Sequence, residues 1–176
     1  MVLTTRQSTA GSHRLGCLTM GAAIVAVVTT LGAQPAQAAG HCMSVGGKFS
    51  SLPVTPPLCT SPVGFCTHGR LRGALAGSYD FTMNTLIPAG DPSIPGVVFF
   101  TGTSLITPRR GGSIVGTDSG AIDLSPFGSA KMASLITLID GADGLEGAGG
   151  YLQLRGGLDF ATGGVTGDYH GELCLP

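Results

Sequence analysis

The chain has 176 residues, of which 30 are glycine, 11 are proline and none is tryptophan. Charged residues make up only 11% and hydrophobic residues 43%, which excludes a solvated disordered chain, and the glycines lack the strict spacing of collagen. Long helices and coiled coils are excluded as well, because each glycine costs roughly 1 kcal/mol in a helix interior. A formal net charge of −1 argues against an electrostatic interaction with nucleic acid. The composition favours many short strands joined by tight turns.

The first 38 residues have the features of a secretory signal peptide. Arg6 and Arg14 supply a sparse positive start, residues 17–33 are almost entirely apolar, and residues 36–38 (AQA) form a small-x-small cleavage site. We therefore predict cleavage after Ala38 and a secreted or periplasmic protein with no membrane anchor after cleavage. A retained anchor is disfavoured because no basic stop-transfer cluster follows the apolar stretch.

Four cysteines remain after the predicted cleavage site: Cys42, Cys59, Cys66 and Cys174. An even number in an exported chain predicts two disulfides, with three possible pairings. We favour Cys59 with Cys66, which closes a short proline-containing loop, and Cys42 with Cys174, which joins the two ends. A zinc site is disfavoured because C-x-x-C spacing is missing, and we expect neither a metal nor a cofactor.

Two regions follow the leader. Residues 39–69 contain several prolines and three of the cysteines, and they predict an irregular or partly extended arm stapled by disulfides. Residues 70–176 predict the β-barrel domain, because apolar runs there alternate with turn clusters and no segment favours more than one helical turn. An all-β antiparallel meander of this length has reason to close into a barrel, since closure removes its unpaired edges. The expected strands are 71–87, 97–107, 113–124 with an interruption at 118–120, 132–139, 151–160 and 165–175.

The last two strands predict a hairpin with its turn at residues 161–164. Phe160 then lies opposite Val165, and Arg155 lies opposite His170 on a polar face that we expect to meet solvent. The other face is apolar and consists of Leu152, Leu154, Leu158, Phe160, Val165, Tyr169 and Leu173.

The strands at 97–107 and 132–139 are apolar on both faces, which indicates cover on both sides. In a closed barrel the inner face packs the lumen, and a neighbouring subunit is the simplest cover for the outer face. An outer-membrane barrel is disfavoured because the final strand carries charges on its alternate face and the chain has too few aromatic residues for two girdles.

Several motifs carry a resemblance to a known family: GRLRGALAGSYDF (69–81), the P-x-x-x-G-x-x-x-F pattern from Pro92 to Phe100, GTDSGAIDL (116–124), and the glycine-rich stretch 140–157 leading to VTGDYHGELCLP (165–176). In these motifs the chain resembles the allene oxide cyclase barrel family, whose eight-stranded calycin-like fold is shared with plant dirigent proteins. The resemblance implies an eight-stranded closed antiparallel barrel with an apolar lumen, in a homo-oligomer, either dimer or trimer.

The resemblance also implies a function class. Relatives cyclise a reactive fatty-acid epoxide, steer the coupling of phenoxy radicals or close polyketide rings, and in each case a cavity fixes one conformation of a flexible apolar molecule. We expect a small apolar ligand in the lumen (lipid, phenolic or polyketide-like) and, if the protein is an enzyme, a cofactor-free isomerase or cyclase. The alternative is a noncatalytic binding or assembly protein with a filled barrel.

Few residues offer chemistry of their own. Asp118 and Asp123 are either a carboxylate pair or turn formers that bond nearby backbone amides. Tyr79 is either a proton donor in the lumen or a buried tyrosine with a satisfied hydroxyl, and His170 is the plausible acid or base near neutral pH. The motifs of hydrolases, kinases and metalloproteases are missing from the sequence, which disfavours those classes.

Overall fold

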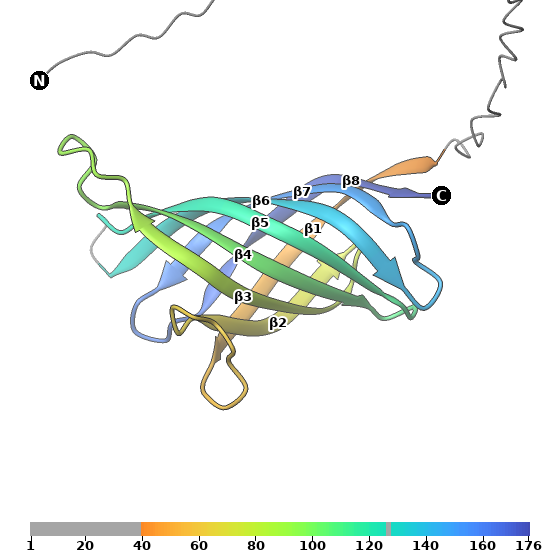
Figure 1. Ribbon diagram of the computed structural model, residues 1–176, viewed down its shortest axis with the longest axis horizontal. Helices are drawn as coiled ribbons and strands as arrows, with labels where there is room; N and C mark the ends of the chain where they lie inside the picture. The colour runs from red at the N-terminus through yellow and green to blue at the C-terminus, as the bar shows by residue number, and fades with distance from the viewer. Residues whose placement is uncertain (1–39, 126–127) are drawn as a thin grey trace, which may run out of the picture. The chain divides into compact units, whose positions relative to one another are not determined.

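The computed structural model describes residues 40–125 and 128–176, in which eight antiparallel strands close into one barrel (Figure 1). Each strand pairs with its neighbours in the chain, and the first strand closes against the last. The strands are β1 (His41–Val54), β2 (Cys66–Gly73), β3 (Gly77–Pro88), β4 (Val97–Pro108), β5 (Ser113–Asp123), β6 (Ser129–Ala142), β7 (Gly149–Asp159) and β8 (Val165–Leu175). This architecture confirms the expected all-β closed barrel.

The predicted signal peptide, residues 1–38, lies outside the described residues. Within the two described ranges, no helix is long and apolar enough to cross a membrane.

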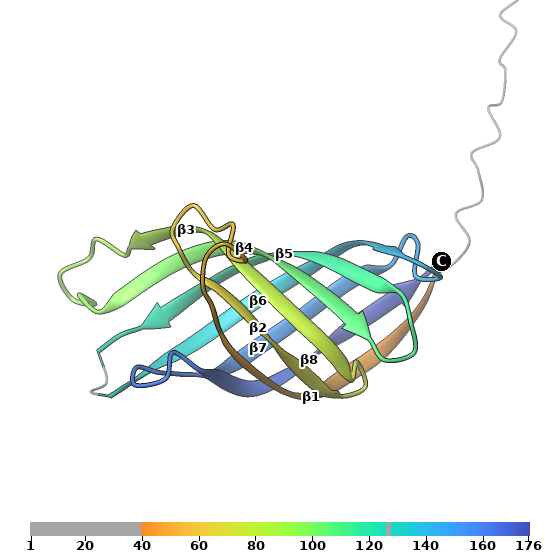
Figure 2. The ribbon, with the colours of Figure 1, turned by 90° about the horizontal axis from the view of Figure 1, so that it is seen from below.

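The barrel begins earlier than the predicted boundary at residue 70. Most of the predicted arm is strand, formed by β1 and the start of β2, and only residues 55–65 form an irregular loop. β1 pairs with β8 on one side and with β2 on the other (Figure 2). Val45, Phe49 and Ser51 of β1 face the lumen and are buried. The alternation is hidden in the sequence because the inward position between Val45 and Phe49 is Gly47, against which the ring of Tyr169 packs.

The two ends of the barrel differ. At one end lie the short turns β2–β3 and β4–β5, the β6–β7 loop and the ends of β1 and β8, and there the lumen is filled by apolar side chains. Tyr169 is polar as well as large, and its hydroxyl accepts a hydrogen bond from the Leu75 N–H at 3.0 Å. The filling residues are Val45, Leu71, Leu75, Ile106, Ile114, Ile136, Leu138, Leu152, Tyr169 and Leu173. The other end, with the β1–β2 and β3–β4 loops, is less filled.

The β7–β8 hairpin is shifted by two residues from the predicted register. Leu158 rather than Phe160 lies opposite Val165, and Arg155 lies opposite Asp168 rather than His170. The turn is longer than expected because the Asp159 carboxylate accepts hydrogen bonds from the N–H groups of Ala161 and Thr162. Side chains alternate with period two, so a shift of two leaves the predicted faces of the other residues unchanged. Phe160, predicted on the apolar face, lies beyond the end of β7 and is 46% exposed.

Two other strand predictions differ from the structure. The run 71–87 is divided by a turn at residues 74–76, which separates β2 from β3. The interruption predicted at residues 118–120 is wrong, because β5 continues through these residues in register with both neighbouring strands.

The outer wall carries apolar side chains where both faces were expected to be covered. Phe99 and Leu105 on β4 and Leu135 and Ile139 on β6 point outward and are 40–55% exposed. The homo-oligomer that would cover them stays a prediction of the sequence.

Both favoured disulfides are present, Cys42–Cys174 and Cys59–Cys66. The first joins β1 to β8 at the filled end, where the two residues are directly paired across the seam of the barrel. The second joins the loop after β1 to the first residue of β2.

We predict that the two disulfides stabilise the fold unequally. Their cysteines are 132 and 7 residues apart, and a chain-entropy treatment of loops of these lengths gives about 5 and about 2.5 kcal/mol. Urea unfolding should therefore show a larger loss for Cys42→Ser/Cys174→Ser than for Cys59→Ser/Cys66→Ser. Equal losses would show that loop length does not determine the effect.

Gly171 on β8 is expected to tolerate no side chain. A Cβ there would meet the Tyr151 carbonyl oxygen and the Leu152 Cα of β7, which are backbone atoms that cannot move aside. Gly171→Ala should lower the free energy of unfolding by about 1–3 kcal/mol, the usual cost of overpacking. Gly149→Ala is the matched control, because a Cβ there meets nothing within 4 Å. The prediction fails if the two variants have the same thermal midpoint.

Candidate functional site

A cluster of polar side chains lies inside the lumen on three neighbouring strands. Asp118 of β5 accepts a hydrogen bond at Oδ2 from the Ser104 Oγ of β4, at 2.6 Å. Its Oδ1 accepts a second from the Ser134 Oγ of β6, at 3.2 Å. Inward positions on adjacent strands lie diagonally across from each other, which is why residues so far apart in sequence meet here.

Tyr79 of β3 extends this cluster. Its hydroxyl oxygen lies 3.3 Å from the Ser104 Oγ. A serine hydroxyl has one proton, and the shorter contact to Asp118 takes it, so Tyr79 is the donor in this contact. The result is a chain of hydrogen bonds from Tyr79 through Ser104 to Asp118, and every buried side-chain polar atom in the described residues has a partner.

The electrostatics of the cluster are dominated by burial. Asp118 is only 4% exposed, and it is the one charged residue among the buried side chains of residues 40–125 and 128–176. Burial raises its pKa to about 6, although the hydrogen bonds from Ser104 and Ser134 act in the opposite direction. Burial, together with the nearby charge of Asp118, also raises the pKa of Tyr79.

The rest of the chamber is mostly apolar, with Ser51 and Thr67 as its other polar lining residues. Phe81 and Phe100 meet edge to face with centroids 5.8 Å apart, and Phe49 meets the Tyr79 ring in the same way at 6.4 Å. The ring of Phe81 occupies the space beside Gly102, where a Cβ would collide with it. The remaining apolar wall consists of Phe65, Met83, Ile122, Met132, Leu154, Leu158 and Val165.

The chamber is narrow. It measures about 460 Å³ when its open mouth is counted, but the space left for the centres of water molecules is about 40 Å³. Since one water needs roughly 10–15 Å³ by this measure, the chamber holds only a few waters with the side chains as they stand.

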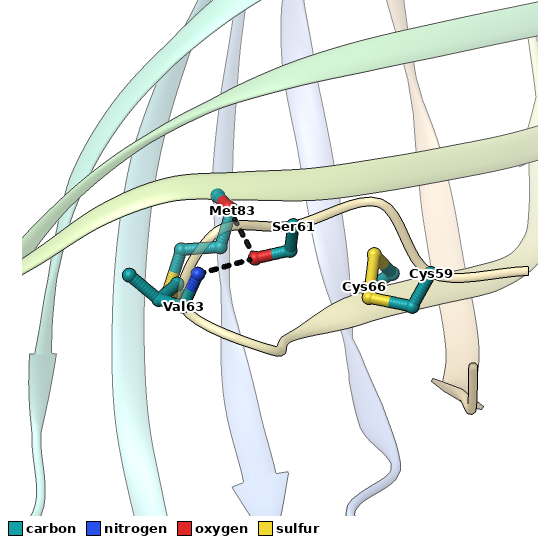
Figure 3. The surroundings of a disulfide bond; sticks show 5 residues. All are labelled: Cys59, Ser61, Val63, Cys66 and Met83. Carbon is teal, nitrogen blue, oxygen red and sulfur yellow. Dashed lines mark hydrogen bonds between the residues drawn. A yellow bond between two sulfur atoms is a disulfide. The ribbon is translucent and has the colours of Figure 1, made fainter. Parts of the chain in front are cut away.

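The Cys59–Cys66 loop is fixed against β3 beside the mouth (Figure 3). The Ser61 hydroxyl donates a hydrogen bond to the Met83 carbonyl and accepts one from the Val63 N–H at 3.2 Å. The Met83 N–H donates to the Phe65 carbonyl at 3.0 Å, next to the irregularity where β3 and β4 shift register. These contacts hold the Phe65 ring at the chamber.

The structure brings together two of the four predicted site residues, Tyr79 and Asp118. Asp123 is exposed at the end of β5, where it accepts a hydrogen bond from the Ser125 N–H at 2.9 Å, as expected of a turn former. His170 is exposed on the outer wall, opposite Gln153 of β7 and far from the lumen by strand alternation. The four therefore do not form one site.

Sequence reasoning missed Ser104 and Ser134 as members of the site. Both occupy inward positions on strand faces that are otherwise apolar, and that placement was the available signal. On the outer wall, the Nδ1 of His68 in β2 lies 2.6 Å from the Asp80 carboxylate, a pair that the sequence did not predict.

Comparisons with known proteins show a likeness in fold alone. Neither a family model nor a curated protein matches the sequence. Among solved structures, the chain is similar to the pterocarpan synthase dirigent protein GePTS1, with a TM-score of 0.45 and 10% sequence identity. The match covers 77% of this chain and 91% of that chain.

The raised pKa of Asp118 predicts a pH-dependent stability. Its value of about 6 lies above the ordinary 3.8, so between pH 4 and 6 the folded state binds more protons than the unfolded state. The free energy of unfolding therefore falls as pH rises through this window, by about 2 kcal/mol.

Urea unfolding of wild type and Asp118→Asn at pH 4, 5 and 7 tests this prediction. Asparagine does not titrate, so the variant should gain about 2.5 kcal/mol relative to wild type between pH 4 and 7, while other groups cancel in the difference. Of the side chains facing Asp118, Ser104 and Ser134 do not titrate and Tyr79 titrates far above this range. Parallel pH curves for the two proteins would contradict a raised pKa.

Proposed function

We propose that the barrel binds a small, mostly apolar molecule in the open half of its lumen, with one polar group of that molecule at Asp118. The observation that carries this proposal is a buried carboxylate within a chamber whose lining is mostly apolar and aromatic. Ligand sites commonly combine apolar walls with a few convergent polar groups and a perturbed pKa. The resemblance of the sequence to the allene oxide cyclase barrel family points in the same direction.

The narrow chamber favours a slender ligand. Met83 and Met132 line the pocket, and their unbranched side chains can change rotamer to admit a chain-like molecule. Phe65 and Leu158 line the chamber and are only partly buried, so they stand where such a molecule would enter.

The same site supports a cofactor-free isomerase or cyclase. A carboxyl group with a pKa of about 6 can take up and release a proton near neutral pH, which suits general acid–base catalysis. Tyr79 and Ser104 would supply the hydrogen-bonded chain behind it. Orientation of a flexible substrate by the aromatic walls would then contribute much of the rate.

The alternative is a noncatalytic binding or assembly protein. The filled half of the lumen favours it, because apolar packing there leaves no role for a ligand. The two proposals differ at the open half, where an assembly protein needs neither a chamber nor a buried acid.

The two disulfides are typical of an oxidising, extracytoplasmic environment. We propose that residues 1–38 direct export and are removed, which gives a secreted or periplasmic protein. A ligand would then be taken from the cell envelope or the surroundings of the cell.

Titration with 1-hexanol tests lumen binding. Wild type should bind it, as measured by calorimetry, and Leu158→Trp should weaken binding at least about tenfold by filling the mouth, roughly the effect of losing one well-buried contact. Leu105→Trp is the matched control, because Leu105 lies on the outer wall and is 40% exposed. Native mass spectrometry of the purified protein would add the identity of any copurified molecule. Equal binding by the two variants, or none by wild type, would overturn the proposal.

A further inference from the structure

We propose that the ligand is a cation: a small alkyl- or arylammonium ion whose N–H groups bind the Asp118 carboxylate. This inference rests on the proposed binding function and adds the charge of the ligand to it.

Among the described residues, no cationic side chain lies beside the Asp118 carboxylate in the chamber. Asp118 is buried, and neither the side chains lining the chamber nor any other buried side chain of the described residues is lysine, arginine or histidine. The two salt bridges of the described residues, Lys48–Asp168 and His68–Asp80, both lie on the outer surface. A buried carboxylate without a cation is costly, so an ammonium group that enters the chamber supplies the charge that the protein lacks.

The Asp118 carboxylate can accept more hydrogen bonds than the two serines donate to it. An ionised carboxylate offers about four acceptor positions. The serines use one on each oxygen, Ser104 at Oδ2 and Ser134 at Oδ1. Both oxygens can still accept, and a primary ammonium group has three N–H donors to offer. An anionic ligand would be repelled by the same carboxylate.

Aromatic rings line the chamber together with Asp118. Phe49, Tyr79, Phe81 and Phe100 line the same chamber as Asp118, in two edge-to-face pairs. The faces of aromatic rings attract cations, and the attraction is larger where water is excluded. A carboxylate among aromatic rings therefore favours an ammonium ion over a neutral alcohol of the same size.

The test compares three ligands of equal chain length at pH 8: hexylammonium, 1-hexanol and hexanoate. Asp118 is ionised at this pH and the amine is protonated, since primary amines titrate near pH 10. Calorimetry should give hexylammonium a Kd at least about tenfold lower than that of 1-hexanol, because hydrogen bonds to charged partners are roughly twice as strong as neutral ones. Hexanoate should bind most weakly.

Two variants test whether the charge of Asp118 causes the preference for hexylammonium. Asp118→Asn should bring the Kd values of hexylammonium and 1-hexanol together, because the amide carries no charge. Asp168→Asn is the matched control, since it makes the same chemical change at an exposed carboxylate on the outer wall, and it should keep the preference. Circular dichroism and thermal unfolding establish that each variant is folded.

The outcomes distinguish the two proposals. If 1-hexanol binds and hexylammonium binds no better, the inference of a cationic ligand is overturned and the lumen proposal stands. If neither binds, both are overturned. A preference for hexylammonium that survives in Asp118→Asn also overturns the inference, because the cation would then bind elsewhere.

Discussion

The structure depends on one seam, the pairing of β1 with β8. These strands are joined along residues 41–51 and 165–175, with the Cys42–Cys174 disulfide across their ends. Closure at this seam leaves the sheet without a free edge. Closure also fixes the width of the lumen, because an eight-stranded barrel encloses a space that inward side chains can just fill. The volume inside is then set by which inward positions are large and which are glycine.

That constraint divides the lumen into two halves. At the filled end of the barrel, the large side chains of Leu75, Ile114 and Tyr169 pack in the core. Toward the other end, the inward glycines at positions 102 and 120 leave space that the rings of Phe81 and Phe100 occupy from neighbouring strands. The rings line the wall and do not fill the centre. Asp118 of β5 lies directly opposite Gly102 of β4 and two residues before Gly120, and it lines the space that remains.

The sequence was sufficient for the class of fold and for the faces of most strands, because burial on one face imposes a period of two. It was insufficient where a glycine occupied an inward position, as at Gly47 in β1, or where a turn was set by a side chain, as at Asp159. The disulfide pairing followed from position along the chain. The site was predicted in part, since Tyr79 and Asp118 stood out chemically. Ser104 and Ser134 did not, because serine in a strand acquires meaning only from the residue opposite or diagonal to it.

The cost of Asp118 is the strongest argument for a function inside the lumen. A barrel that only needed stability would place an apolar side chain at this position, as it does at Ile114 and Ile122 on the same strand. Instead, two serines donate hydrogen bonds to a buried acid and a tyrosine bonds one of the serines, but no cationic side chain of the described residues accompanies the acid. Local arrangements that oppose stability tend to mark functional sites. The charge that the described residues leave uncompensated is therefore the feature to which a ligand must be matched.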